Sequence, residues 1–367
     1  MKASQCPSEN WSSWMRRALQ LASLGEGCTS PNPLVGALVL DIDGRLVGES
    51  FHSRAGQPHA EIGALAQAGE RAKGGTLVVT LEPCCHTGRT PPCTQAILKS
   101  GISLVVIALE DPDPRVAGKG IQILRNAGIK VLTGVLSSQA KFQNRAFIFR
   151  IKHGRPWGIL KWAMSIDGRT ALTNGQSKWI TGSESREWVY QLRAKCDAVI
   201  VGGGTLRADN PLLTSRGIAY PEPLRVVLSK SLNLPQTARI WNTSEAKTIL
   251  ASSFKLLDKN ELQIPVGPDL LDLESTGPIN LLEKLAERDC NQILWECGPK
   301  LATAAINQEC VQEIFVFVAP KLLGGIVART PLGDFGFESM DQVLSFGFGS
   351  LQKLGKDFLL NIPINKI

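Results

Sequence analysis

The stretch from His59 to Cys93 reads HAEIGALAQAGERAKGGTLVVTLEPCCHTGRTPPC and decides the fold of the first half of the chain. It contains one histidine, two cysteines that each follow a proline, and the acidic residue Glu61. These residue types predict a catalytic zinc site, in which one histidine and two cysteines bind the metal and a fourth position stays open for water. On a helix Glu61 lies about 200° around the axis from His59. We therefore expect it to cover the open position and carry protons rather than bind the metal.

A structural zinc site is the alternative reading of the same residues. Cys85 could complete a closed four-ligand set with His59, Cys84 and Cys93. The paired Cys-x-x-Cys spacing of such sites is missing, however, and a closed site would give Glu61 no role. The sequence therefore favours a catalytic site, while chemistry alone leaves the choice between Cys84 and Cys85 open.

Bulk properties describe an ordinary globular protein of 367 residues, which is long enough for two domains. Apolar residues make up 43% and charged residues 20%, and the net charge is +7. No run approaches the ~18 apolar residues of a membrane span, and no basic run with interleaved aromatics points to nucleic acid. The nine cysteines suit reduced thiols. We expect a cytoplasmic enzyme without a secretory leader, membrane contact or nucleic-acid partner.

Strand and helix patterns alternate along the chain and predict an α/β fold in both halves. We place a linker over Lys141–Arg155, giving domains of residues 1–148 and 149–367. The weakly patterned stretch 233–268 is expected on the surface. Helices are predicted at 11–24, 61–71, 93–100, 183–195 and 300–307. Strands are predicted at 34–40, 76–80, 103–109, 158–162, 197–201, 224–228, 292–295 and 313–318.

Two glycine turns in the second half could receive a phosphate group. Gly202-Gly203-Gly204 follows a strand, but Arg207 replaces the last glycine of the dinucleotide-binding motif, so that signal is weak. The run from Glu296 to Pro299 also joins a strand to a helix, whose free N–H groups suit phosphate. An ordinary strand-to-helix turn remains the alternative for both.

The motifs of the first half resemble the deaminase half of the bifunctional riboflavin-biosynthesis deaminase–reductase family. They are Ser30–Gly36, Gly56–Glu61, Leu81–Cys84, Gly88–Cys93 and Asp111–Gly120. The resemblance implies a cytidine-deaminase-like α/β/α domain. It implies that His59, Cys84 and Cys93 bind Zn²⁺, with Cys84 favoured by its place after Pro83, and that Glu61 is the proton shuttle. By the same resemblance, the substrate contacts are Asn32, His52, His86, Arg89 and the turn 111–114.

The second half resembles the reductase half of the same family, which has a dihydrofolate-reductase-like α/β fold. The matching motifs are Lys161–Arg169, Ser177–Gly182, Leu192–Ala194, Asp209–Arg216 and Ala319–Gly325. The resemblance implies NADPH contacts at Ala163, Trp179, Thr205, Asp209, Gly298, Pro299, Lys300, Leu301, Ala302 and Thr303. It implies substrate contacts at Lys161, Ser177, Arg193, Leu213, Arg216 and Glu296, with the arginines on the phosphate.

The resemblance implies two successive reactions on a small nucleotide-like substrate. The first is hydrolytic deamination of 2,5-diamino-6-ribosylamino-4(3H)-pyrimidinone 5′-phosphate, and the second is NADPH-dependent reduction of the ribosyl chain. A homo-oligomer is also expected. Two positions depart from the family pattern, since Asp113 and Ser50 stand where asparagine and glycine are common. The rival readings are a nucleic-acid deaminase, which shares the zinc pattern, and a zinc-stabilised binding protein.

Overall fold

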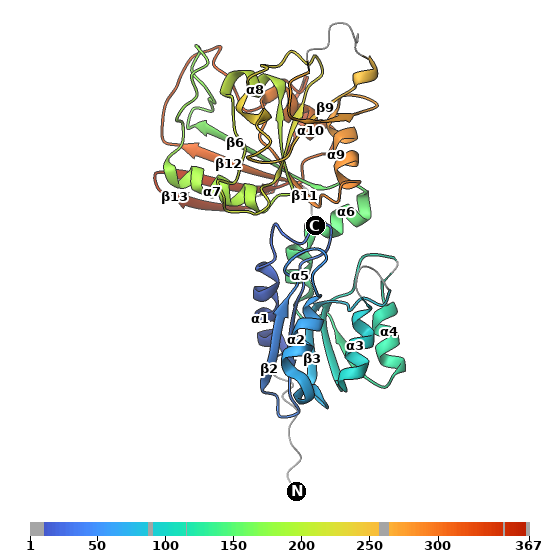
Figure 1. The fold of residues 1–367 in the computed structure, drawn as a ribbon. Helices are drawn as coiled ribbons and strands as arrows, with labels where there is room; N and C mark the ends of the chain where they lie inside the picture. Colours follow the sequence, from blue (N-terminus) through green and yellow to red (C-terminus); the bar gives the residue numbers. More distant parts are fainter. Residues whose placement is uncertain (1–10, 87–90, 115, 257–263, 348, 365–367) are drawn as a thin grey trace. The chain divides into compact units, whose positions relative to one another are not determined.

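A computed structural model describes residues 11–86, 91–114, 116–256, 264–347 and 349–364. The chain divides into two compact units between His153 and Gly154. Each unit has its own central sheet with helices packed on it (Figure 1). Both halves are therefore α/β, as the alternating pattern predicted.

The first unit is built around a five-stranded sheet in the order β2-β1-β3-β4-β5. Its strands β1 and β2 form an antiparallel hairpin, and β3, β4 and β5 run parallel to one another. The strands are β1 (Gly36–Leu40), β2 (Leu46–Phe51), β3 (Thr76–Leu81), β4 (Leu104–Leu109) and β5 (Lys130–Thr133). The helices are α1 (Trp11–Ser23), α2 (Ala60–Ala68), α3 (Cys93–Ser100), α4 (Lys119–Asn126), α5 (Ser137–Gln143) and α6 (Arg145–His153), with a 3-10 turn at Gly69–Ala72.

Helices cover both faces of this sheet because successive strand residues point to opposite sides. Leu38, Val78 and Val106 face α1 and α5 in one buried cluster. Their strand neighbours, such as Val79 and Ile107, pack against α2, α3 and α4 in another. The first unit is thus an α/β/α sandwich, and its central strands are apolar on both faces.

The second unit has a nine-stranded sheet in the order β10-β9-β8-β7-β11-β6-β12-β14-β13. All neighbours run parallel except at the β14 and β13 edge. The strands are β6 (Trp157–Ser165), β7 (Ala198–Gly202), β8 (Leu224–Leu228), β9 (Thr248–Ser252), β10 (Asp269–Asp272), β11 (Gln292–Trp295), β12 (Glu313–Ala319), β13 (Ser350–Leu354) and β14 (Asp357–Pro363). The helices are α7 (Ser183–Ala194), α8 (Gly203–Asp209), α9 (Pro278–Ala286) and α10 (Pro299–Asn307), with 3-10 turns at Arg239–Trp241, Phe254–Leu256 and Met340–Gln342.

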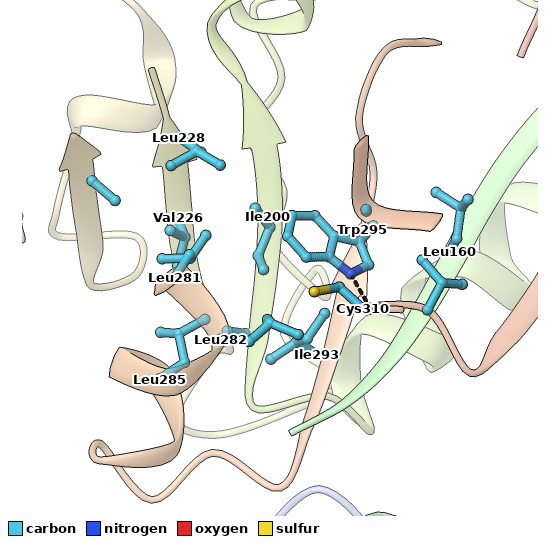
Figure 2. Close-up of a cluster of buried hydrophobic side chains, with 14 of the residues drawn as sticks. Leu160, Ile200, Val226, Leu228, Leu281, Leu282, Leu285, Ile293, Trp295 and Cys310 are labelled. Atoms are coloured by element: carbon cyan, nitrogen blue, oxygen red, sulfur yellow. Dashed lines mark hydrogen bonds between the residues drawn. The ribbon is translucent and has the colours of Figure 1, made fainter. Parts of the chain in front are cut away.

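The core of the second unit gathers around Trp295 at the end of β11 (Figure 2). Its indole Nε1 donates a hydrogen bond of 3.0 Å to the Cys310 carbonyl oxygen, so the buried polar atom is satisfied. Leucines of α9 and alanines of α10 pack on this side of the sheet. On the opposite side Trp188 of α7 packs against Phe315 and Phe317 of β12, with ring centroids 4.9 and 5.5 Å apart.

Two expectations about organisation were wrong in part. The stretch Lys141–Arg155 is largely helical, in the end of α5 and in α6, and α6 ends where the first unit ends. The stretch 233–268 is not all surface, because β9 is buried along its whole length and Ile240 and Trp241 lie in the core.

None of the helices in the described ranges is long and apolar enough to span a membrane. The eight cysteines in those ranges are all free thiols.

Candidate functional site

Three elements of the first unit bring together the predicted zinc ligands. His59 lies at the N-terminal cap of α2, Cys93 is the first residue of α3, and Cys84 follows β3. Their ligand atoms all lie within 4.8 Å of one another. His59 Nδ1 is 3.2 Å from Cys93 Sγ and 3.5 Å from Cys84 Sγ. Tetrahedral zinc with ordinary bond lengths separates such atoms by about 3.5 Å, so the donor set fits zinc.

The start of α3 also prepares Cys84 as a thiolate. The backbone N–H of Cys93 donates to Cys84 Sγ over 3.3 Å. Hydrogen bonds from the Cys93 side chain and from His59 hold the pKa of Cys84 well below the usual range of a thiol. A thiolate at a helix N-terminus is favoured by the helix dipole and is the form that binds a metal.

Glu61 lies beside this cluster on the first turn of α2. Its side chain is 3% exposed and within hydrogen-bonding reach of the Cys93 thiol. Burial, together with the charge of Cys84, raises the pKa of Glu61 to about 7. Within the described residues the ligand cluster consists of His59, Cys84 and Cys93 alone, and neither Glu61 nor Cys85 joins it. A carboxyl group with this pKa can both take up and release a proton near neutral pH.

His52 and Asn32 form a pair behind the ligand His59. The Nδ1 of His52 lies 3.2 Å from the Pro58 carbonyl oxygen, so this nitrogen carries the proton. Its Nε2 therefore accepts the Asn32 amide N–H over 3.0 Å. Burial lowers the pKa of His52, which is 2% exposed and hence neutral. Both ring nitrogens thus have protein partners, and the pair connects Asn32 to the residue before His59.

Asn144, which sequence reasoning missed, holds the segment that carries Asn32. It is buried between α5 and α6. Its Oδ1 accepts the N–H of Leu34 over 2.8 Å, and its Nδ2 donates to the Leu34 carbonyl over 2.9 Å. The Arg150 guanidinium also donates to the Pro31 carbonyl over 3.1 Å. No local motif marks Asn144, because it acts on a residue more than a hundred positions earlier.

The other predicted substrate contacts of the first unit differ in their surroundings. Asp111 and Asp113 are buried, and Asp111 Oδ1 accepts the Asp113 N–H over 2.8 Å, which closes the predicted turn. His86 is exposed. Arg89 lies outside the described residues.

A charged cluster joins three predicted substrate residues of the second unit. Glu296, after β11, forms a bidentate pair with Arg193 of α7, at 2.6 and 3.0 Å. Its Oε2 is also 3.6 Å from Lys161 Nζ on β6. Burial opposes ionisation of Glu296, but the charges of Arg193 and Lys161 outweigh it and hold its pKa at about 2. Glu296 is therefore a carboxylate at neutral pH.

Tyr190, a second residue missed from the sequence, connects Arg193 with Arg216. Each guanidinium carbon lies 5.7 Å from the centre of its ring. Arg193 also donates to the Thr214 carbonyl over 2.9 Å. Leu213 is buried, and both it and Arg216 adopt left-handed backbone angles, with φ of 59° and 62°. Arg216 itself is exposed.

Two helix N-termini abut where a cofactor phosphate was predicted. Strands β7 and β11 are parallel neighbours, and α8 and α10 begin directly after them. A Cβ on Gly298 would lie 3.2 Å from Thr205 Oγ1, so a side chain there would fill the space between the two helix starts. The cap residue of α10, Gly298, has no side chain that could cap the first N–H groups. Free N–H groups at the carboxyl ends of parallel strands fit a dinucleotide phosphate.

The remaining predicted cofactor and substrate residues lie on the loops and strands around this point. Ser177 Oγ is 3.3 Å from Asp209 Oδ1 at the end of α8. Trp179 is 63% exposed, with the Arg186 guanidinium 4.5 Å from its ring centre. Ala163 lies on β6, and Pro299, Lys300, Leu301, Ala302 and Thr303 form the first turns of α10. Thr303 accepts the Gly333 N–H over 2.8 Å, so its hydroxyl supports the loop after β12.

Comparisons with known proteins match both units. The family described as the cytidine and deoxycytidylate deaminase zinc-binding region matches residues 8–109, and the RibD C-terminal domain matches residues 156–360. The riboflavin biosynthesis protein RibD of Synechocystis is 50% identical over 347 residues, covering 94% of each chain. The Acinetobacter baumannii RibD structure superposes with a TM-score of 0.87 at 40% identity, covering 96% of this chain and 98% of that one. A Thermotoga maritima deaminase/reductase structure gives a TM-score of 0.86 at 35% identity, with coverages of 96% and 98%.

Proposed function

The chain belongs to the bifunctional deaminase–reductase family of riboflavin biosynthesis, and we propose from this premise how its residues divide the two reactions. It has a cytidine-deaminase-like zinc domain followed by a dihydrofolate-reductase-like domain. The first domain deaminates 2,5-diamino-6-ribosylamino-4(3H)-pyrimidinone 5′-phosphate. The second reduces the ribosyl chain of the product to give 5-amino-6-(5-phosphoribitylamino)uracil. The observation that carries the deaminase assignment is the convergence of His59, Cys84 and Cys93 beside the buried Glu61.

In the deaminase domain, His59, Cys84 and Cys93 would hold zinc, and zinc when bound supplies Lewis-acid activation of water. Glu61 takes a proton from the attacking water and delivers it to the leaving amine. A pKa of about 7 suits both halves of that transfer. Neutral His52 accepts a hydrogen bond from Asn32 and so fixes its amide, which is assigned to the pyrimidine. His86, Arg89 and the turn 111–114 are assigned to the rest of the substrate.

In the reductase domain, NADPH when bound supplies the hydride, and the protein orients the sugar and the proton donor. Glu296 cannot donate a proton at neutral pH because its pKa is about 2. Lys161, 3.6 Å from that carboxylate, is therefore the proton donor we assign. Arg193 and Arg216 are assigned to the substrate phosphate because both guanidinium groups lie at Tyr190; the bidentate face of Arg193 itself is held by Glu296. Ser177 and Leu213 complete the substrate side.

The NADPH site is assigned to the abutting helix starts and the loops beside them. The phosphates and ribose of the cofactor would be bound by Thr205, Asp209 and the run Gly298–Thr303. The rest of the cofactor would contact Ala163 and Trp179. The support is the space beside Gly298 and the glycine cap of α10, which has no side chain to occupy the first N–H groups. Cys297, just before it, is half-buried, and its desolvation raises the pKa of its thiol.

We also propose a homo-oligomer that forms through the β13 edge. Most of β13 is exposed, and an edge strand with free backbone groups is a template for pairing with another chain. Leu351 is 57% exposed and shares a sheet face with Phe358, which is 43% exposed. A second copy that packs symmetrically on this edge would also cover these two apolar side chains. The free thiols favour a cytoplasmic location.

One coupled assay tests the function. Purified chain with zinc is given the diamino pyrimidine nucleotide, and ammonia release is followed by NADPH oxidation. We expect ammonia first and NADPH oxidation only after it. Ammonia release from tRNA but not from the free nucleotide would overturn the assignment in favour of a nucleic-acid deaminase.

A further inference from the structure

A buried carboxylate that the proposed chemistry does not use lies two residues before the ligand Cys84. Glu82 is 3% exposed. Its Oε2 accepts the backbone N–H of Asp111 over 3.2 Å and of Gly118 over 2.9 Å, and its Oε1 accepts that of Ile121 over 3.1 Å. All three donors belong to the segment that follows β4. One side chain thus holds both ends of that segment.

The carboxylate also caps α4 from outside the helix. Gly118 is the N-terminal cap residue of α4, and Ile121 lies in its first turn. The helix has no capping hydrogen bond from a side chain of its own cap residue. The first N–H groups of a helix need acceptors, and a negative charge there also interacts favourably with the helix dipole. Glu82 meets both needs with charge-assisted bonds, which are stronger than neutral ones.

The segment lies directly against the ligand turn. A Cβ on Gly120 would overlap the Pro83 carbonyl oxygen, so only glycine allows this approach. The backbone N–H of Glu82 donates to the Leu109 carbonyl over 2.9 Å, and the Cys84 carbonyl accepts the Thr94 N–H over 3.2 Å. Glu82 therefore connects the zinc-ligand turn to the turn at Asp111–Asp113.

We propose that Glu82 is a positioning residue of the deaminase site, which fixes the Asp111–Asp113 turn against the Cys84 turn before the substrate binds. The inference rests on the proposed function of this site and adds a residue that touches neither metal nor substrate. A turn that is already ordered before binding lowers the entropic cost of binding the substrate. Its loss should raise KM more than it lowers kcat.

The test compares Glu82→Gln with Glu70→Gln in the full-length zinc enzyme. Glu70 is an exposed carboxylate in the same unit and serves as the matched control. Zinc content, ammonia-release kinetics and hydrogen exchange of the Asp111, Gly118 and Ile121 amides are measured for both. For Glu82→Gln we expect wild-type zinc content and a KM that accounts for most of a loss of about 10–100-fold in kcat/KM. We also expect faster exchange across the segment, with no change for Glu70→Gln.

Three results would overturn the proposal: an unchanged KM with full zinc, a loss confined to kcat, or unchanged exchange. If Glu82→Gln does not fold, the wild type alone decides the structural claim. Its amides at Asp111, Gly118 and Ile121 must then exchange far more slowly than exposed loop amides. Rapid exchange of these amides would refute the claim that Glu82 holds the segment. If the wild type releases no ammonia from the pyrimidine nucleotide, the proposed function fails. The hydrogen-exchange measurement still tests whether Glu82 holds the segment.

Discussion

Replacing Glu296 by glutamine should destabilise the second unit and remove a specific dependence on pH. The substitution keeps the shape of the side chain but deletes the charge that faces Arg193 and Lys161. Both partners are largely buried, with side-chain exposures of 12% and 18%. Removing one partner of a buried pair is costly because the remaining charges lose their compensation.

The lowered pKa gives the magnitude. Folding moves the pKa of Glu296 from 4.5 to about 2, a difference of about 2.5 units. At 1.36 kcal/mol for each unit, the ionised carboxylate stabilises the fold by about 3 kcal/mol. For a unit of this size, a loss of that order lowers Tm by about 6–12 °C.

The sign of the pH dependence follows from the direction of the shift. Because the folded-state pKa is lowered, the stabilisation is complete above pH 4.5 and is lost as the pH falls toward about 2. The difference in unfolding free energy between wild type and Glu296→Gln should thus be full at pH 7 and shrink between pH 4.5 and 2.

Calorimetry and urea unfolding of both proteins at pH 7, 4 and 3 measure this difference. Glu287→Gln is the matched control, since Glu287 pairs with Lys284 at 2.9 Å on the surface, with 60% of its own side chain exposed. Its loss should change stability by less than ~1 kcal/mol. A difference for Glu296→Gln below ~1 kcal/mol at pH 7, or one that grows as the pH falls, would refute the reasoning.

Three other predictions concern the zinc site, the Asn32 segment and the β13 edge. Removing zinc with a chelator should abolish ammonia release but leave NADPH oxidation on the deaminated nucleotide intact; loss of both activities would contradict a separate zinc site. Asn144→Ala deletes two buried hydrogen bonds to Leu34 and should lower the unfolding free energy of the first unit by about 2 kcal/mol. It should also raise the deaminase KM. An unchanged KM in ammonia-release kinetics would show that Asn144 does not position Asn32 for the substrate. Leu351→Lys should halve the mass that light scattering gives for the wild type; the same mass for both proteins would rule out the β13 interface.

Local signals in the sequence were enough for many individual elements. The helix at 93–100 and the strands at 224–228 and 292–295 have the bounds that the sequence predicted. Prolines before Cys93 and the glycine after Ser100 mark that helix within the chain itself. Short apolar runs bounded by polar residues mark the two strands.

The sequence did not reveal features that depend on distant partners. β13 and β14 form an edge hairpin against β12, and nothing in residues 350–363 alone specifies that pairing. Asn144 and Tyr190 carry no motif, since each acts through a neighbour in space. Arg193 and Glu296 were predicted separately as substrate contacts. The structure brings them together in one bidentate pair, although they lie 103 positions apart in the sequence.

The residue types of the zinc site could be read from the chain because zinc chemistry admits few ligand sets. The environment of Glu61 could not, since its pKa depends on burial and on the charge of Cys84. The same holds for Glu82, which looks like an ordinary acidic residue until its three backbone partners are seen.

The most direct test of the central claim is Glu61→Ala, with zinc content and ammonia release measured on the same preparation. Because Glu61 lies outside the ligand cluster, we predict zinc at the wild-type level and ammonia release reduced by at least about 10²-fold. Reduction of the deaminated nucleotide by NADPH should continue at the wild-type rate. Ammonia release that survives with zinc in place would contradict the assignment of Glu61 as the proton shuttle.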